Sequence, residues 1–184
     1  MKKFILIFVA LISIKSINAQ NKIYSTKTAT AWFDAGTGME DITGTNKSVL
    51  SAMNANTGDI QFSVLIKGFE FWSALLMEHF NENYMESGKY PKSTFKGKIT
   101  DMNKVNVAKD GSYPVTVKGT LEIHGVKKEV ETKGTLKIKG ETITASSEFI
   151  VVLEDYKIVI PGVVKDKLSK TAKIKINCNY TLSK

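Results

Sequence analysis

Apolar and polar residues alternate one by one through most of this chain. Such a period of two is the pattern of β-strands that bury one face and expose the other. The alternation is clearest near the carboxyl end, where lysine, asparagine and threonine separate six apolar positions: Ala172, Ile174, Ile176, Cys178, Tyr180 and Leu182. It recurs in segments 60–66, 95–99, 115–123, 130–138 and 143–153, and more weakly near 22–35 and 41–54. The pattern therefore predicts about eight strands.

Turn residues separate these strands. Three dipeptides between strands fit tight hairpins, and a fourth turn separates the second strand from the third: Asp110-Gly111, His124-Gly125, Lys139-Gly140 and Thr57-Gly58-Asp59. Many short strands with tight turns are typical of a β-sandwich or a β-barrel. Glycines on apolar faces indicate strands that coil sharply or leave interior space, and the chain has three: Gly97, Gly119 and Gly134. We therefore expect an all-β fold, and a barrel in preference to a sandwich.

One segment, from Ser73 to Gly88, departs from the period of two and predicts a short amphipathic helix between two strands. Ser73 suits the N-cap and Gly88 suits the carboxyl-terminal stop. Apolar residues share one face: Leu76, Met77, Phe80 and Tyr84. Glutamates mark the solvent face: Glu78, Glu82 and Glu86. This apolar face either belongs to the core or caps one mouth of the barrel and contacts a ligand.

A second irregular segment, from Asp155 to Ser169, is apolar but does not alternate. It contains Tyr156, Ile158 and Val164. Because it cannot form part of a strand wall, its apolar side chains must pack over something or line an opening. We predict that residues 76–84 of the helix and residues 156–164 of this segment border the entrance to the barrel.

The amino terminus has the layout of a secretory signal peptide. Two lysines, Lys2 and Lys3, precede an apolar run of about 11 residues, whereas a bilayer-spanning helix takes about 20. Ala19 supplies a small residue at the cut, ahead of Gln20. We expect residues 1–19 to be removed, leaving residues 20–184 as one domain in the periplasm or outside the cell. With Cys178 as the only cysteine, that domain must rely on its hydrophobic core.

The charge pattern argues against nucleic-acid binding. The formal charge is +8, and it falls to +5 when Lys2, Lys3 and Lys15 leave with the signal peptide. Every basic residue is lysine, so the chain has no guanidinium fork for bidentate contacts to guanine or phosphate. The lysines alternate with apolar residues along the strands, as on the solvated face of a sheet. Weak attraction to an anionic membrane surface fits this charge better.

Three stretches occur in a set order behind this signal peptide. They are Phe69-Glu70-Phe71 with Leu76-Met77-Glu78-His79-Phe80 and Met85, then Lys89-Tyr90-Pro91-Lys92-Ser93-Thr94-Phe95, then Gly119-Thr120-Leu121-Glu122-Ile123-His124-Gly125-Val126-Lys127-Lys128-Glu129-Val130. Together they resemble the YceI-like family of exported bacterial proteins. The resemblance implies an eight-stranded antiparallel lipocalin-like barrel, with an elongated apolar channel that holds a polyisoprenoid chain in some members. The chain departs from the commoner family pattern at residues 72–80, and its amino-terminal strand lacks the usual histidine-serine pair.

No set of residues suits catalysis or metal binding. His79 stands beside Glu78, but a metal site needs three or four converging ligands, and the other histidine, His124, falls in a predicted turn. We expect His79 to hydrogen-bond the barrel rim instead. Cys178 lies on the apolar face of its strand and is predicted to be a core residue. Nucleophile-elbow, dinucleotide and phosphate-loop motifs are absent, so we predict neither an enzyme nor a cofactor.

The prediction is therefore a barrel that holds one long apolar lipid, of polyisoprenoid or quinone-like kind. Aromatic and aliphatic side chains are expected to line its channel and mouth: Phe62, Val64, Phe69, Phe71, Leu76, Phe80, Tyr84, Phe95, Val117, Leu121, Phe149, Tyr156, Ile158 and Ile176. The alternative is a barrel filled by its own side chains, which acts as an interaction or structural module of the cell envelope.

Overall fold

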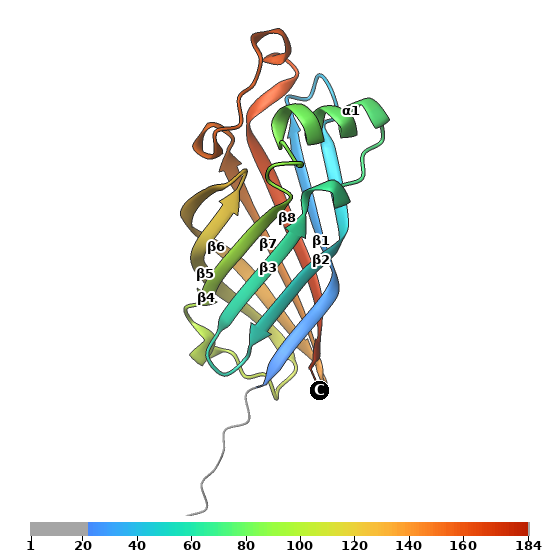
Figure 1. Cartoon of the computed structure of the whole chain (residues 1–184). Coiled ribbons are helices and arrows are strands. Elements are labelled where there is room, and N and C mark those ends of the chain that lie inside the picture. Colours follow the sequence, from blue (N-terminus) through green and yellow to red (C-terminus); the bar gives the residue numbers. More distant parts are fainter. Residues whose placement is uncertain (1–21, 184) are drawn as a thin grey trace, which may run out of the picture.

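A computed structural model describes residues 22–183 as a closed barrel of eight antiparallel strands (Figure 1). The strands are β1 (Ile23–Gly36), β2 (Thr43–Asn54), β3 (Asp59–Leu65), β4 (Lys92–Ile99), β5 (Gly111–Ile123), β6 (Val126–Lys139), β7 (Thr142–Val152) and β8 (Leu168–Leu182). Each strand pairs with the next, and β8 pairs with β1 to close the wall. The predicted all-β, eight-stranded antiparallel barrel is confirmed. The predicted signal peptide, residues 1–19, lies outside the described residues.

The alternation in the sequence separates the inside of the barrel from the outside. On β8, Ala172, Cys178 and Tyr180 are buried, whereas Lys173 and Asn179 are exposed. Residues directly opposite one another in an antiparallel ladder point to the same face. An inward-facing residue on one strand therefore has inward-facing partners on the two neighbouring strands, all around the barrel.

Of two predicted hairpin turns, one is present and the other is not. His124 and Gly125 alone connect β5 to β6, and both have positive φ angles (52° and 72°), as a tight hairpin turn requires. The prediction of a tight hairpin at Asp110-Gly111 is wrong, because residues 100–110 separate β4 from β5. This connection contains the short 3₁₀-helix η3 (Met102–Lys104) and buries Met102, so it closes one end of the barrel.

Gly97 and Gly119 face each other across the β4–β5 ladder. A Cβ added to Gly119 would strike the carbonyl oxygen of Lys96 and the Cα of Gly97. These two glycines therefore allow the backbones of β4 and β5 to approach closely.

The predicted short helix between two strands is present, and its second part is a π-helical turn. The α-helix α1 (Ala74–His79) continues into the π-helical turn η2 (Phe80–Tyr84), in which the Met85 amide donates to the Phe80 carbonyl oxygen at 2.9 Å. Ser73 occupies the N-cap, but its side chain makes no capping hydrogen bond. Four-residue spacing predicts an α-helix and carries no sign of the wider turn, which arises where Phe80 packs against the barrel.

Large side chains fill the end of the barrel that holds the carboxyl terminus (Figure 1). Tyr180, Met53, Ile99 and Ile143 are all fully buried there. The hydroxyl groups of Tyr180 and Ser51 lie 2.6 Å apart, so each provides the other with a hydrogen-bond partner. Cys178 is buried beside them, as predicted, and this burial raises the pKa of its thiol to about 11. The thiol therefore stays protonated and unreactive at neutral pH.

Among residues 22–183, no helix has the length and apolar character needed to cross a bilayer.

Candidate functional site

The opposite half of the barrel is hollow. A pocket of about 460 Å³ lies inside the wall, and Ile99, Leu136 and Cys178 line it on the side of the filled end. Its walls are formed by the inner faces of the strands and are almost entirely aliphatic and aromatic. The barrel is thus filled at one end and open inside at the other, a distinction that the strand pattern alone does not provide.

Every side chain that the sequence predicted as lining the channel or mouth lies in the wall of this pocket. Phe62, Phe95 and Leu121 contribute from β3, β4 and β5, and Phe149 and Ile176 contribute from β7 and β8. The pocket thus brings together residues more than a hundred positions apart in the sequence. Their role in holding a ligand remains a prediction.

Strand β1 supplies lining residues that the sequence analysis missed. Ala31, Phe33 and Ala35 all face the pocket. Their alternation was visible, but small alanine side chains make a weak hydrophobic signal. Ala31 and Ala35 are small where larger residues would fill the interior, so this part of β1 contributes to the hollow.

Four phenylalanine rings gather at the open end. Phe80 of η2 stacks on Phe33 with ring centroids 5.3 Å apart, and it contacts Phe69 at 5.4 Å and Phe71 at 5.0 Å. Phe33 also meets Phe69 and Phe71 edge to face, at 5.4 and 5.9 Å. These distances are typical of favourable aromatic pairs. The cluster fixes the helical segment over the pocket.

The two irregular segments lie at this same end, away from the carboxyl terminus (Figure 1). Leu75 and His79 of α1 border the pocket on one side, and Val164 and Lys167 of the β7–β8 connection border it on another. Glu40 of the β1–β2 loop is also at this border and pairs with Lys167 at 2.9 Å. Both segments that were predicted to flank the entrance therefore contribute to the pocket lining.

His79 is exposed at this border, and its side chain makes no hydrogen bond to any other residue in the described range 22–183. The predicted hydrogen bond between His79 and the barrel rim is therefore wrong. The ring projects from a helix that is itself anchored by the phenylalanine cluster, so it has no need of a polar anchor.

The other histidine, His124, connects two segments at the open end of the barrel through hydrogen bonds. His124 is buried, and its Nδ1 donates to the Tyr156 carbonyl oxygen at 3.1 Å while its Nε2 lies 2.7 Å from a Glu86 carboxylate oxygen. Tyr90 packs edge to face on the imidazole at 4.6 Å. Both ring nitrogens of His124 thus have a hydrogen-bond partner. His124 therefore joins the segment after the helix to the start of the β7–β8 connection, which sequence spacing gave no means of seeing.

We expect His124→Ala to lower the free energy of unfolding by about 1–3 kcal/mol, because it leaves a buried carbonyl group and a carboxylate without their partner. Chemical denaturation measures this difference. The matched control is His79→Ala, which removes an exposed ring without a hydrogen bond and should change stability by less than about 0.5 kcal/mol. Equal effects of the two substitutions would contradict the anchoring role of His124.

Among the described residues, no group of three or more histidine, cysteine, aspartate or glutamate side chains is placed to hold a metal ion. His79, His124 and Cys178 lie in separate surroundings: a helix surface, a buried turn and the barrel interior. The pocket itself holds few groups that donate or accept protons, so its chemistry is that of apolar contact.

The model of the YceI-like domain family matches residues 11–180. The chain belongs to the YceI-like family. A search of curated proteins finds no match.

Solved structures with this YceI-like fold come from several bacteria. A polyisoprenoid binding domain from Saccharophagus degradans, implicated in plant cell wall breakdown, is 14% identical and has a TM-score of 0.76, with 89% of this chain and 100% of that one covered. Burkholderia cenocepacia BcnA is 16% identical with a TM-score of 0.68, covering 83% of this chain and 96% of that one. A Campylobacter jejuni YceI protein is 16% identical with a TM-score of 0.56, covering 77% and 86%. At these identities the likeness establishes the fold.

Proposed function

We propose that this YceI-like barrel is an exported lipid-binding protein that holds one long apolar chain, of polyisoprenoid or quinone-like kind, in its hollow half. The observation that carries the proposal is the pocket. Its volume of about 460 Å³ falls within the range of small-molecule sites, about 300–1,000 Å³. An apolar, largely preformed cavity of this size suits a ligand that is itself apolar.

Burial of apolar surface provides the driving force. Removing about 400 Å² of hydrocarbon from water, at about 25 cal/mol/Å², contributes roughly 10 kcal/mol. Loss of ligand freedom on binding offsets several kcal/mol of this. The net value corresponds to a dissociation constant between micromolar and nanomolar.

Further observations support the proposal. A structural neighbour of the same fold is described as a polyisoprenoid binding domain. The amino-terminal residues have the pattern of a signal peptide, which suits a protein of the periplasm or of the exterior. The lysine-rich outer face suits weak attraction to an anionic membrane surface. A filled barrel acting as an interaction module would have no need of the hollow half, and a pocket with so few polar groups favours binding over catalysis.

A titration with an apolar fluorescent probe, followed by displacement with geranylgeraniol, tests this function. The matched variants are Ala31→Trp, which places a large side chain in the pocket, and Ala108→Trp, which places the same side chain on the exposed β4–β5 connection. We expect Ala31→Trp to weaken probe binding about tenfold or more, and Ala108→Trp to leave it unchanged. Equal binding by all three proteins would contradict a ligand site inside the barrel.

A further inference from the structure

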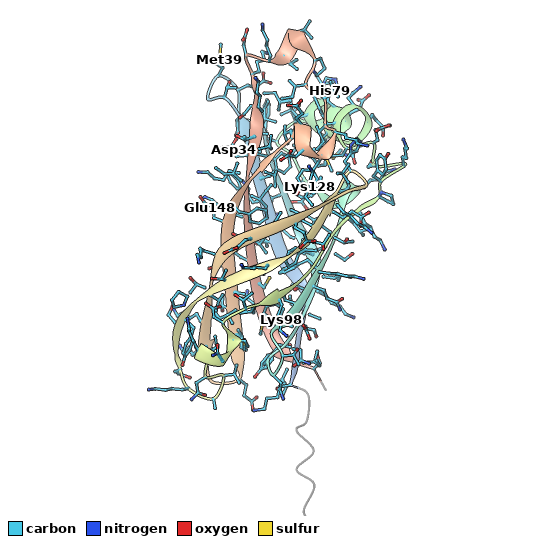
Figure 2. The ribbon with its side chains drawn as sticks, turned by 90° about the vertical axis from the view of Figure 1, so that its left-hand side faces the viewer. Asp34, Met39, His79, Lys98, Lys128 and Glu148 are labelled. Atoms are coloured by element: carbon cyan, nitrogen blue, oxygen red, sulfur yellow. The ribbon has the colours of Figure 1, made fainter. Side chains whose placement is uncertain are left out.

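Strands β6 and β7 are paired over only part of their length. Their ladder runs from Lys139↔Thr142 to Gly134↔Ser147 and ends there. Above it, residues 126–133 of β6 pair only with β5, and residues 148–152 of β7 pair only with β8. We call this unpaired region the β6–β7 seam. Figure 2 faces this side of the barrel, where the strands that carry Lys128 and Glu148 separate toward the end that carries His79.

A second short ladder, between β2 and β3, shows how such a region is closed elsewhere. That ladder ends at Leu50↔Ser63, but the Asn46 side chain, fully buried, then donates to the Leu65 carbonyl oxygen at 2.9 Å. A backbone bridge between Thr45 and Glu70 continues the closure. At the lower end of the β6–β7 seam the Ser147 hydroxyl donates to the Lys133 carbonyl oxygen at 2.7 Å, but no backbone bridge follows among the described residues. The backbone groups beyond this hydrogen bond therefore have no ladder partner across the seam.

The inner face becomes polar along this seam. Thr132 and Ser147 point inward, as their ladder partners Val117 and Ile176 do, and their hydroxyl oxygens lie 3.2 Å apart. Both residues line the apolar pocket. Thr132 and Ser147 thus place hydroxyl groups on the inside of a wall that is mostly aliphatic and aromatic, and they do so where the ladder ends.

The outer surface of the barrel is also hollowed at the lower end of the seam. An outer cavity of about 320 Å³ lies there and shares Gly134, Thr135, Ser146 and Ser147 with the wall of the apolar pocket. These four residues form the last two rungs of the ladder, Gly134↔Ser147 and Thr135↔Ser146, so the two spaces lie on opposite sides of the same stretch of wall. The outer cavity is also lined by Lys133, Lys175 and Glu148.

Positive charge exceeds negative charge around this outer cavity. Lys133 donates to the Thr116 hydroxyl at 3.0 Å, and the nearby Glu131 carboxylate is itself paired with Lys118 at 2.9 Å. Lys173 and Lys175 both approach the single carboxylate of Glu148, at 3.7 and 3.5 Å. The site therefore offers lysine ammonium groups beside the hydroxyl groups of Thr135 and Ser146, a combination that suits an anionic, oxygen-rich group.

We propose that the β6–β7 seam seats the polar head of the bound lipid, and that this head is anionic, a phosphate monoester or a carboxylate. This inference rests on the proposed lipid-binding function and specifies the ligand further. The apolar chain occupies the pocket, and the head passes through the unpaired part of the seam, above the Ser147–Lys133 hydrogen bond, and lies beside the outer cavity. A charged head placed there stays hydrated, which avoids the large cost of burying it in the apolar pocket.

Competition between ligands with the same chain tests the head-group site. The experiment measures how well three ligands displace the fluorescent probe: geranylgeraniol, its phosphate monoester and its methyl ether. Each ligand is tested on the unaltered protein, on Lys133→Gln and on a control variant, Lys137→Gln. Lys137 is an exposed lysine on the same strand below the seam. In the unaltered protein and in Lys137→Gln, we expect the phosphate to bind about tenfold more tightly than the ether. In Lys133→Gln this preference should disappear, with the affinity for the ether unchanged, and added salt should reduce the preference in the unaltered protein.

The outcomes separate the two proposals. If the ether binds but the phosphate binds no more tightly, or if Lys133→Gln keeps the preference, the head-group site is wrong and the lipid-binding function stands. If neither ligand displaces the probe from the unaltered protein, the proposed function itself fails. Circular dichroism confirms that both variants keep the barrel, because both substitutions change exposed side chains.

Discussion

Phe80→Asp should release bound lipid from the protein while the barrel stays folded. Phe80 is the one ring of the phenylalanine cluster that comes from the helical segment, and it contacts all three others. An aspartate there replaces these contacts with a carboxylate that must reach water. The helical segment should then detach from the open end of the pocket. We expect retention of lipid through purification to fall about tenfold or more, whereas the strand signal in circular dichroism should persist, because α1 and η2 are not part of the wall.

Met77→Asp is the matched control for this experiment. Met77 lies on the same helix but is exposed and does not line the pocket, so its substitution should leave both lipid content and stability nearly unchanged. Unfolding of the barrel by Phe80→Asp would show that the helical segment is core. Unchanged folding and unchanged lipid content would show that it lies away from the ligand.

Gly119→Ala should have the largest effect on stability. Its Cβ would meet the backbone of the neighbouring strand at Lys96 and Gly97, where no flexible side chain can move aside. We expect the free energy of unfolding to fall by about 3 kcal/mol or more, as in severe overpacking. Denaturant unfolding measures it, and the reference variants are Gly134→Ala, with its nearest backbone contact at 3.0 Å, and Gly162→Ala, with open space around it. The order of destabilisation should be Gly119, Gly134, Gly162. A loss below about 1 kcal/mol for Gly119→Ala would contradict the close backbone approach.

The period of two predicted the barrel because each strand carries the pattern on its own residues. The alternation in β5, β6 and β8 is strong, and the turn at His124-Gly125 is encoded by the two residues that form it. The same local rule failed at Asp110-Gly111, where the dipeptide follows a longer connection that closes the filled end of the barrel. Turn chemistry describes the backbone at its own residues and says nothing of how many residues precede them.

The pocket lining was predictable to a large extent for the same reason, since inward-facing positions follow from the alternation. Three features were not. The hollow depends on which inner residues are small, such as Ala31 and Ala35, relative to those across the barrel. The anchoring by His124 depends on Glu86 and Tyr156, which lie 38 and 32 residues away. The β6–β7 seam depends on where two strands part, although Thr132 and Ser147 marked its position as polar residues on an apolar face.

Native mass spectrometry of the protein, purified without detergent from cells that export it, tests the central claim most directly. The account predicts a species carrying one apolar lipid per chain, which organic extraction then recovers, and predicts that this species is lost in Ala31→Trp but not in Ala108→Trp. A single unliganded mass in repeated preparations, together with failure of the purified protein to take up an added isoprenoid lipid, would contradict it.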